Sequence, residues 1–511
     1  MNRPRPKTLA LLTIPLAGAL ALSGCFSAAA EQAGSTGRIS VAHMQPPRSG
    51  LSPLSDDAFK LSRWSTAETL VNLDASGDAQ PALATSWERS GELAWDFEIR
   101  EGVSFHNGQP LTADTVANSL QRAIDSTPVP RILNGTALKV AVRGEHGLRI
   151  TTADPDPLLP QRLSSPQLAI FAAEAYTANG VDPAGHGTGP FQIVGVDGIS
   201  GATLDRYEGY WGEKAAASGI DVKFVPDGTA RAAALRTSEA DVIEAIPAGQ
   251  AATVDQELLT EVPMPRTNTL YLNTEKGPFA DPAVRAAARE AIDRAAIVES
   301  VYENRADIAE GLLGPALPYA AGLRDSGEYR QLLAQRAEPA KVKDVEITLG
   351  TFTDRAELPE VAVILEQQLE AAGFIVKQDV REYQYIEADA LDGAFDAFIL
   401  SRATVLDSGD PVAYFASDFT CEGGFAIAQL CDKDVDQAIA RASETEAGEQ
   451  RQQQIMLAEA RILGTDAAIA LLHERVIQGE GPAVRDAAQD PRERELITAQ
   501  TRLDSEQEPQ R

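Results

Sequence analysis

The stretch from Trp95 to Ile124, WDFEIREGVSFHNGQPLTADTVANSLQRAI, places the strongest constraint on how this chain folds. Apolar and charged residues alternate from Trp95 to Arg100, which is the period of a strand with one buried face. Asn107-Gly108 then predicts a turn, because glycine reaches positive φ without strain. Thr112 and Asp114 can cap a helix in which apolar residues recur every four positions, at Val116, Leu120 and Ile124. The stretch therefore predicts a strand, a turn and a capped helix in succession.

The size and charge of the chain narrow the class of protein. With 511 residues, the chain is too long for one small core, so two or three lobes are expected. Apolar residues make up 44% and charged residues 23% of the chain, as in soluble globular proteins. The formal net charge of −30 argues against a nucleic-acid partner, because phosphate binding needs a basic face. Such a charge also keeps copies of a protein apart in solution, and we expect a monomer.

The N-terminus predicts export. Three basic residues precede an apolar run from Thr8 to Leu22, which is shorter than the roughly 20 residues that a spanning helix needs. Leu22-Ser23-Gly24-Cys25 is similar to a bacterial lipobox. We therefore predict a lipoprotein signal peptide over residues 1–24 and lipidation of Cys25, with residues 25–37 as a flexible tether. This places the protein outside the cytoplasm, anchored to the cell membrane.

Cys421 and Cys431 remain once Cys25 is assigned to the lipid. An exported protein occupies a compartment in which disulfides persist, so we predict that these two cysteines form one. The alternative is a pair of metal ligands, but no further His or Cys stands close enough in the sequence to complete a zinc site. We predict no metal site and no cofactor.

The second half of the chain predicts an α/β unit. Strand patterns at 345–349, 374–380 and 395–400 alternate with a helix pattern at 358–372 that Gly373 can end. Ligands of open parallel sheets bind beyond the carboxyl ends of the strands. This rule indicates the segments 350–354 and 401–411 as walls of a binding site.

Four segments of the chain resemble one protein family. Their matching residues follow the motif order of the family 5 (peptide/nickel-type) extracellular solute-binding proteins of ABC importers, from about Trp64 to Pro411. The segments are Glu68–Trp87, Gly102–Val116, Gly187–Phe191 with Tyr210–Gly212, and Leu272–Asp293.

The resemblance implies an α/β fold of the two-lobed periplasmic-binding-protein type (type II, large peptide-binding subclass), with an extra subdomain on lobe I. Lobe I is expected to combine residues 38–70, 187–266 and 475–511, with the extra subdomain over 71–186. Lobe II is expected over 267–474. The ligand would lie in the cleft between the lobes.

The resemblance also suggests site residues. In peptide-binding members an aspartate of the cleft loop that often ends in "D-P" pairs with the ligand's amine, and Asp410 or Asp407 matches. In nickel-chelate members an arginine at the start of this loop holds carboxylates, and Arg402 matches. Thr404, within this loop, and Tyr414, just after it, are further candidate ligand-binding residues. Trp64 precedes the first motif, where it either faces the ligand or lies in the core.

Catalysis is disfavoured by the pattern of reactive residues. His473-Glu474 begins like a zinc-protease motif, but Ile477 stands where the second histidine is needed. The five histidines show no ligand spacing, and the glycine cluster at 185–191 lacks the form of a nucleotide-binding loop. We therefore expect a binding protein that captures a small solute, most simply a short peptide, and delivers it to a membrane permease. A nickel chelate or another small organic solute is the alternative ligand, and signalling or adhesion on the same fold is the alternative role.

Overall fold

The computed structural model describes residues 37–133, 136–177, 180–355, 357–405 and 408–504. The predicted signal peptide, Cys25 and most of the tether lie outside these residues. None of the described helices is long and apolar enough to cross a bilayer.

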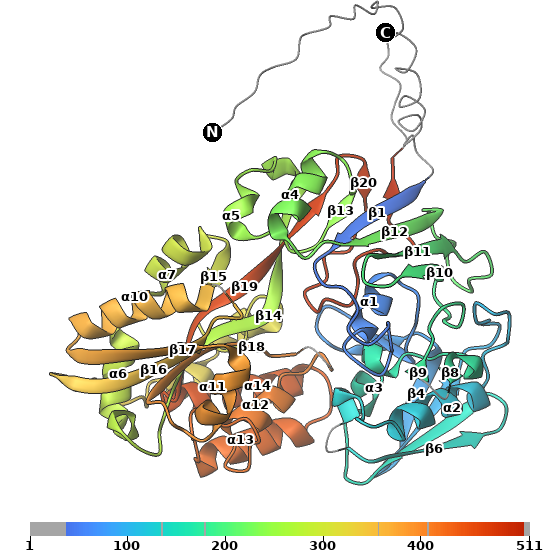
Figure 1. Cartoon of the computed structure of the whole chain (residues 1–511). Coiled ribbons are helices and arrows are strands. Elements are labelled where there is room, and N and C mark those ends of the chain that lie inside the picture. The colour runs from blue at the N-terminus through green and yellow to red at the C-terminus, as the bar shows by residue number, and fades with distance from the viewer. Residues whose placement is uncertain (1–36, 134–135, 178–179, 356, 406–407, 505–511) are drawn as a thin grey trace, which may run out of the picture. The chain divides into compact units, whose positions relative to one another are not determined.

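One large sheet runs through the described residues in the order β10-β11-β12-β1-β13-β19-β14-β18-β16-β17, with β15 paired to β19 (Figure 1). β17 and β18 both lie parallel to β16, which confirms the α/β unit expected in the second half of the chain, and β12 and β13 both lie parallel to β1 in a second such unit. The strands are β1 (Arg38–His43), β10 (Phe191–Asp197), β11 (Gly201–Arg206), β12 (Gly219–Phe224), β13 (Val242–Ile243), β14 (Leu259–Leu272), β15 (Ala306–Ile308), β16 (Val345–Phe352), β17 (Phe374–Arg381), β18 (Ala397–Ala403) and β19 (Ala468–Glu480).

The two long strands β14 and β19 pair antiparallel and link the two halves of the sheet. Their register shifts twice, first where Pro263 pairs with Arg475 while Thr267 pairs with His473, and again between Asn268 and Thr269. Pro263 and Pro265 cannot donate a backbone hydrogen bond, which accounts for the first break. The lobe boundaries predicted at 266/267 and 474/475 fall in this irregular segment.

A smaller antiparallel sheet lies in the predicted extra subdomain. It contains β4 (Ala84–Gly91), β5 (Ala94–Ile99), β7 (Gly147–Thr152) and β6 (Leu138–Arg143), in that order. α2 (Ala113–Ile124) packs against it, and the Thr112 hydroxyl accepts the backbone N–H of Thr115, as a capping residue should. The strand, turn and helix expected from Trp95 to Ile124 are thus confirmed.

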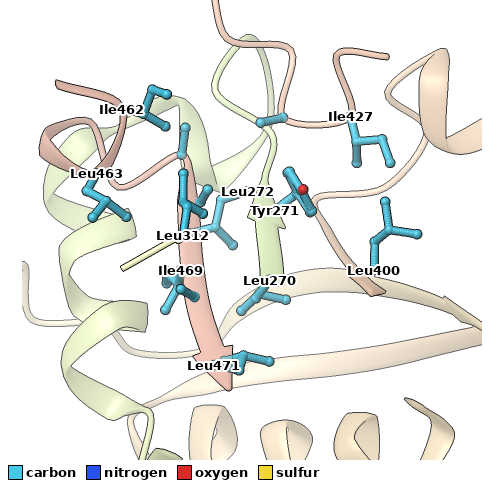
Figure 2. Packing of buried hydrophobic residues seen from close by; sticks show 14 of the residues in the cluster. Leu270, Tyr271, Leu272, Leu312, Leu400, Ile427, Ile462, Leu463, Ile469 and Leu471 are labelled. Carbon is cyan, nitrogen blue, oxygen red and sulfur yellow. The ribbon is translucent and has the colours of Figure 1, made fainter. Parts of the chain in front are cut away.

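Buried apolar side chains form separate clusters in the two lobes. The largest belongs to lobe II, where residues of β14, β18 and β19 pack against α14 (Glu449–Gly464), as Figure 2 shows. Further helices cover this lobe: α6 (Pro282–Ala291), α7 (Arg294–Tyr302), α8 (Tyr319–Arg324), α9 (Gly327–Leu333), α10 (Glu357–Ala371), α11 (Tyr383–Leu391), α12 (Val412–Phe419) and α13 (Lys433–Glu444). Lobe I carries α1 (Ala58–Arg63), α4 (Gly228–Arg236) and α5 (Ala248–Ala251).

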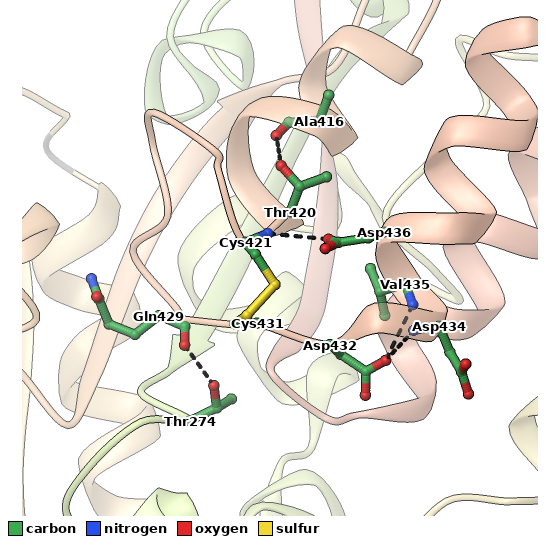
Figure 3. The surroundings of a disulfide bond; sticks show 10 residues. All are labelled: Thr274, Ala416, Thr420, Cys421, Gln429, Cys431, Asp432, Asp434, Val435 and Asp436. Carbon is green, nitrogen blue, oxygen red and sulfur yellow. Dashed lines mark hydrogen bonds between the residues drawn. A yellow bond between two sulfur atoms is a disulfide. The ribbon is translucent and has the colours of Figure 1, made fainter.

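The structure joins Cys421 to Cys431 by a disulfide in the loop between α12 and α13 (Figure 3). The backbone N–H of Cys421 donates to Asp436, and the Thr274 hydroxyl donates to the carbonyl of Gln429, so both ends of this loop are also held by hydrogen bonds.

Replacing both cysteines by serine should lower the free energy of unfolding by about 2 to 3 kcal/mol, because the short loop gains freedom in the unfolded chain. Urea unfolding of the double variant and the wild type measures the difference. A reducing agent should produce the same loss in the wild type and none in the variant. Equal stability of the two oxidised proteins would contradict the expectation.

Candidate functional site

Arg402, at the end of β18, is held within lobe II. Its guanidinium donates to both carboxylate oxygens of the fully buried Asp418, at 2.7 and 2.8 Å, and lies 4.4 Å from the ring centre of Phe425. The ion pair satisfies the charge of Arg402, so the structure gives this side chain a role in packing rather than a free cation for a ligand carboxylate.

Thr404 and Tyr414 are also internal. The Thr404 hydroxyl donates to the carbonyl of Pro265 at 3.2 Å, and the Tyr414 hydroxyl lies 3.4 Å from that of Tyr271. Both residues are buried, and neither lines one of the larger cavities. Thr404 and Tyr414 therefore pack beneath the loop that was predicted to bind ligand, and they do not form its surface.

Asp410 does reach a cavity, of about 340 Å³, between residues 131–162 and 408–451. Its carboxylate is already paired, since Arg451 donates to both oxygens at 2.7 and 3.1 Å and the Val412 N–H donates at 2.9 Å. Arg451 is buried and also donates to three backbone carbonyls. A ligand amine would have to compete with this ion pair, so the structure gives no support to Asp410 as its partner. Asp407, the other candidate, lies outside the described residues.

Trp64 belongs to the core and does not face a cavity. Its indole N–H donates to Nε2 of His43 at 2.8 Å, and Nδ1 of His43 lies 2.6 Å from Glu244. His43 must therefore carry its proton on Nδ1, and burial lowers its pKa below the ordinary value. Burial alone would raise the pKa of Glu244, but Arg63 and His43 hold it well below its usual range.

A cavity of about 500 Å³ lies where both lobes contribute residues. It brings together the ends of β1 and β13, α1, the middle of β14 and the loop after β16. Six basic and four acidic side chains line it: Arg48, Lys60, Arg63, Arg131, Arg266 and Arg355, with Asp56, Asp57, Glu244 and Glu493. We refer to this cavity as the basic cleft. It can attract an anion, even though the whole chain is strongly acidic.

Several cations of the basic cleft have partners within the protein. Lys60 pairs with Asp57 at 3.1 Å, and Arg63 pairs with Glu244. Arg355 pairs with Glu474 at 2.8 Å and, less closely, with Glu357.

Arg266 is different, because no hydrogen bond or ion pair to a described residue satisfies its guanidinium. Its side chain is half-buried on β14, in the irregular segment between the lobes. Burial, and then repulsion from Arg355, lower the pKa of Arg266. Glu493 and Glu474 attract Arg266 without reaching ion-pair distance, so a partly desolvated cation remains that an anionic guest would stabilise.

Part of the basic cleft could be predicted from the sequence. The strand-end rule indicated 350–354, one residue short of Arg355. Arg266, Arg63 and His43 were missed, because each lies far from the others in the chain and none belongs to a motif. The described residues contain no group of three or more His, Cys, Asp or Glu able to hold a metal ion.

Comparison with known proteins gives a consistent result. Residues 78–426 match the model of the bacterial extracellular solute-binding proteins, family 5. The nickel-binding periplasmic protein of Escherichia coli is 28% identical over 415 residues, covering 74% of this chain and 79% of that protein. A probable di/tripeptide-binding protein of Pseudomonas aeruginosa is 28% identical over 429 residues, covering 75% and 79%. The crystal structure of a nickel ABC transporter protein from Bacillus halodurans superposes with a TM-score of 0.78 at 23% identity, covering 91% of this chain and all of the other.

The buried His43 should make stability depend on pH. Because the unfolded chain binds this proton near pH 6.5 and the folded chain only at lower pH, the free energy of unfolding should fall as the pH drops below 6.5. The loss should approach about 1.4 kcal/mol per pH unit for this one group. His43→Gln should flatten the dependence by that amount, measured by urea unfolding between pH 7 and 5. Parallel curves for the two proteins would refute the assignment of a neutral His43.

Proposed function

The chain belongs to the bacterial extracellular solute-binding proteins of family 5, and we propose that it captures a small carboxylate-bearing solute for delivery to an ABC permease. The observation that carries the choice of ligand is the unpaired guanidinium of Arg266 in a cleft with more cations than carboxylates. A carboxylate there would accept charge-assisted hydrogen bonds from Arg266 and from Arg355 or Arg131 nearby.

A short peptide is the first candidate ligand, since its C-terminal carboxylate suits this cluster. Asp407 then remains the predicted partner of the peptide's amine. The Pseudomonas aeruginosa relative, named as a probable di/tripeptide-binding protein, supports this class.

A nickel chelate built from carboxylates is the second candidate. The basic cleft carries two more basic than acidic side chains, which favours a ligand with more than one negative charge. The Escherichia coli relative named as a nickel-binding protein supports this class.

Capture would couple to closure of the lobes. Lys60 and Arg63 approach the basic cleft from α1 in lobe I, while Arg355 approaches from the loop after β16 in lobe II. A ligand that contacts both groups binds the closed state better than the open one, so binding shifts the population toward closure. The segment between Pro263 and Thr267, where the strand register breaks, is suited to absorb the movement.

Membrane attachment is the further part of the proposal. It is supported by the lipobox-like Leu22-Ser23-Gly24-Cys25 and by the twelve residues between Cys25 and Arg38, which could reach about 40 Å when extended. Attachment would keep the protein close to its permease.

Arg266→Gln should weaken binding of the natural ligand by roughly thirtyfold, because a desolvated charged contact is lost. Asp410→Asn should change affinity much less, since Arg451 already occupies that carboxylate. The ligand would be identified by native mass spectrometry of freshly purified protein. Titration calorimetry with a tripeptide mixture and with a nickel–polycarboxylate chelate would then measure the affinities.

Lys377→Gln provides a matched control. It removes one positive charge at an exposed ion pair with Glu346 and should leave the affinity unchanged. Binding that depends on Asp410 and is indifferent to Arg266 would refute the proposed ligand contact.

Cys25→Ser should release the protein from the membrane, because the only predicted site of lipidation is lost. Fractionation of cells that express the wild type and the variant measures the distribution. If the variant stays with the membrane to the same extent as the wild type, the anchor is not a lipid on Cys25.

A further inference from the structure

Three arginines of lobe II meet away from the basic cleft. Arg289 comes from α6, Arg294 is the first residue of α7, and Arg336 follows α9. They line a small cavity of about 40 Å³ together with Glu310, Asp466 and neighbouring residues. No residue of this cavity also lines the basic cleft.

The carboxylates around this cavity are shared unevenly among the three cations, because Glu290 pairs with Arg289 at 3.1 Å and reaches Arg294 and Arg336 only by longer-range attraction. Asp466 is buried and pairs with Arg289, and it lies 3.5 Å from Arg336. No carboxylate of the described residues lies within ion-pair distance of Arg294, whose only hydrogen bond goes from Nε to the carbonyl of Ala470 at 2.7 Å. Glu310 is exposed and makes no ion pair with a described residue.

Arg294 and Arg336 keep hydrogen-bond donors available. Arg336 uses Nε for the carbonyl of Leu463 at 2.9 Å, and Arg294 uses Nε for Ala470, so the terminal nitrogens of both guanidinium groups have no hydrogen-bond partner among the described residues. Burial, and then mutual repulsion, lower the pKa of Arg294. Arg294 stands in the first turn of α7, where the helix dipole disfavours a cation, and the Asp293 carboxylate that caps this turn is used by the backbone N–H of Ala296 at 3.1 Å.

From this arrangement, we propose that the cavity bounded by Arg289, Arg294 and Arg336 binds a small anion, either an inorganic ion or a single carboxylate group. Its volume exceeds the 10 to 15 Å³ that one water molecule needs, so it has room for one such group but not for a large solute. The planar forks of Arg294 and Arg336 present paired N–H donors of the kind that recognise carboxylate and phosphate. An anion there would connect α6, α7 and the segment after α9.

Thermal unfolding of the full chain in chloride, phosphate or acetate tests the site, and the three salts distinguish the source of the anion. At a concentration tenfold above its Kd, the bound anion should shift the folding equilibrium of the wild type by about elevenfold. Arg294→Gln should lose this response. Arg330→Gln, which removes an exposed arginine of α9 paired with Asp325, should respond as the wild type does.

Equal responses of Arg294→Gln and the wild type to all three anions would overturn the proposal. If Arg294→Gln does not fold, Glu310→Gln is the deciding variant, because removing an exposed carboxylate that lines the cavity should strengthen the anion response. A response that is unchanged in Glu310→Gln would then overturn it.

Discussion

β14 and β19 run antiparallel through both lobes, and their pairing determines where the rest of the molecule can lie. Each lobe builds its own parallel unit beside these strands, around β1 in lobe I and β16 in lobe II. Where Pro263 and Pro265 interrupt the ladder, the two strands cannot pair regularly. Arg266 stands at this break, so the same irregularity that separates the lobes also exposes a cation between them.

The charge of the basic cleft differs in sign from the net charge of the chain. The chain carries a large negative charge, yet the basic cleft has more cations than carboxylates. Partly desolvated charges interact more strongly than exposed ones. The cleft can therefore attract an anion that the acidic outer surface repels. The sign of the net charge therefore says nothing about the charge of the ligand.

Charged residues that look like ligand contacts in the sequence can be satisfied by the protein itself. Arg402 pairs with Asp418, and Asp410 pairs with Arg451, across 16 and 41 residues respectively. Each pairing is set by tertiary packing and leaves no trace in a local motif. Trp64 shows the same for an aromatic side chain, because its indole N–H is used by His43 in the core.

The sequence by itself determined the family, the α/β class and most of the regular elements. These depend on local periodicity, capping and turn residues, as from Trp95 to Ile124, and on motifs short enough to read in one stretch. Only the tertiary structure decided which charges remain free. Arg63, Arg266 and Arg355 come from a helix, a strand and a loop that are far apart in the chain. Whether a guanidinium among them has a counterion depends on contacts that form only when the lobes have folded.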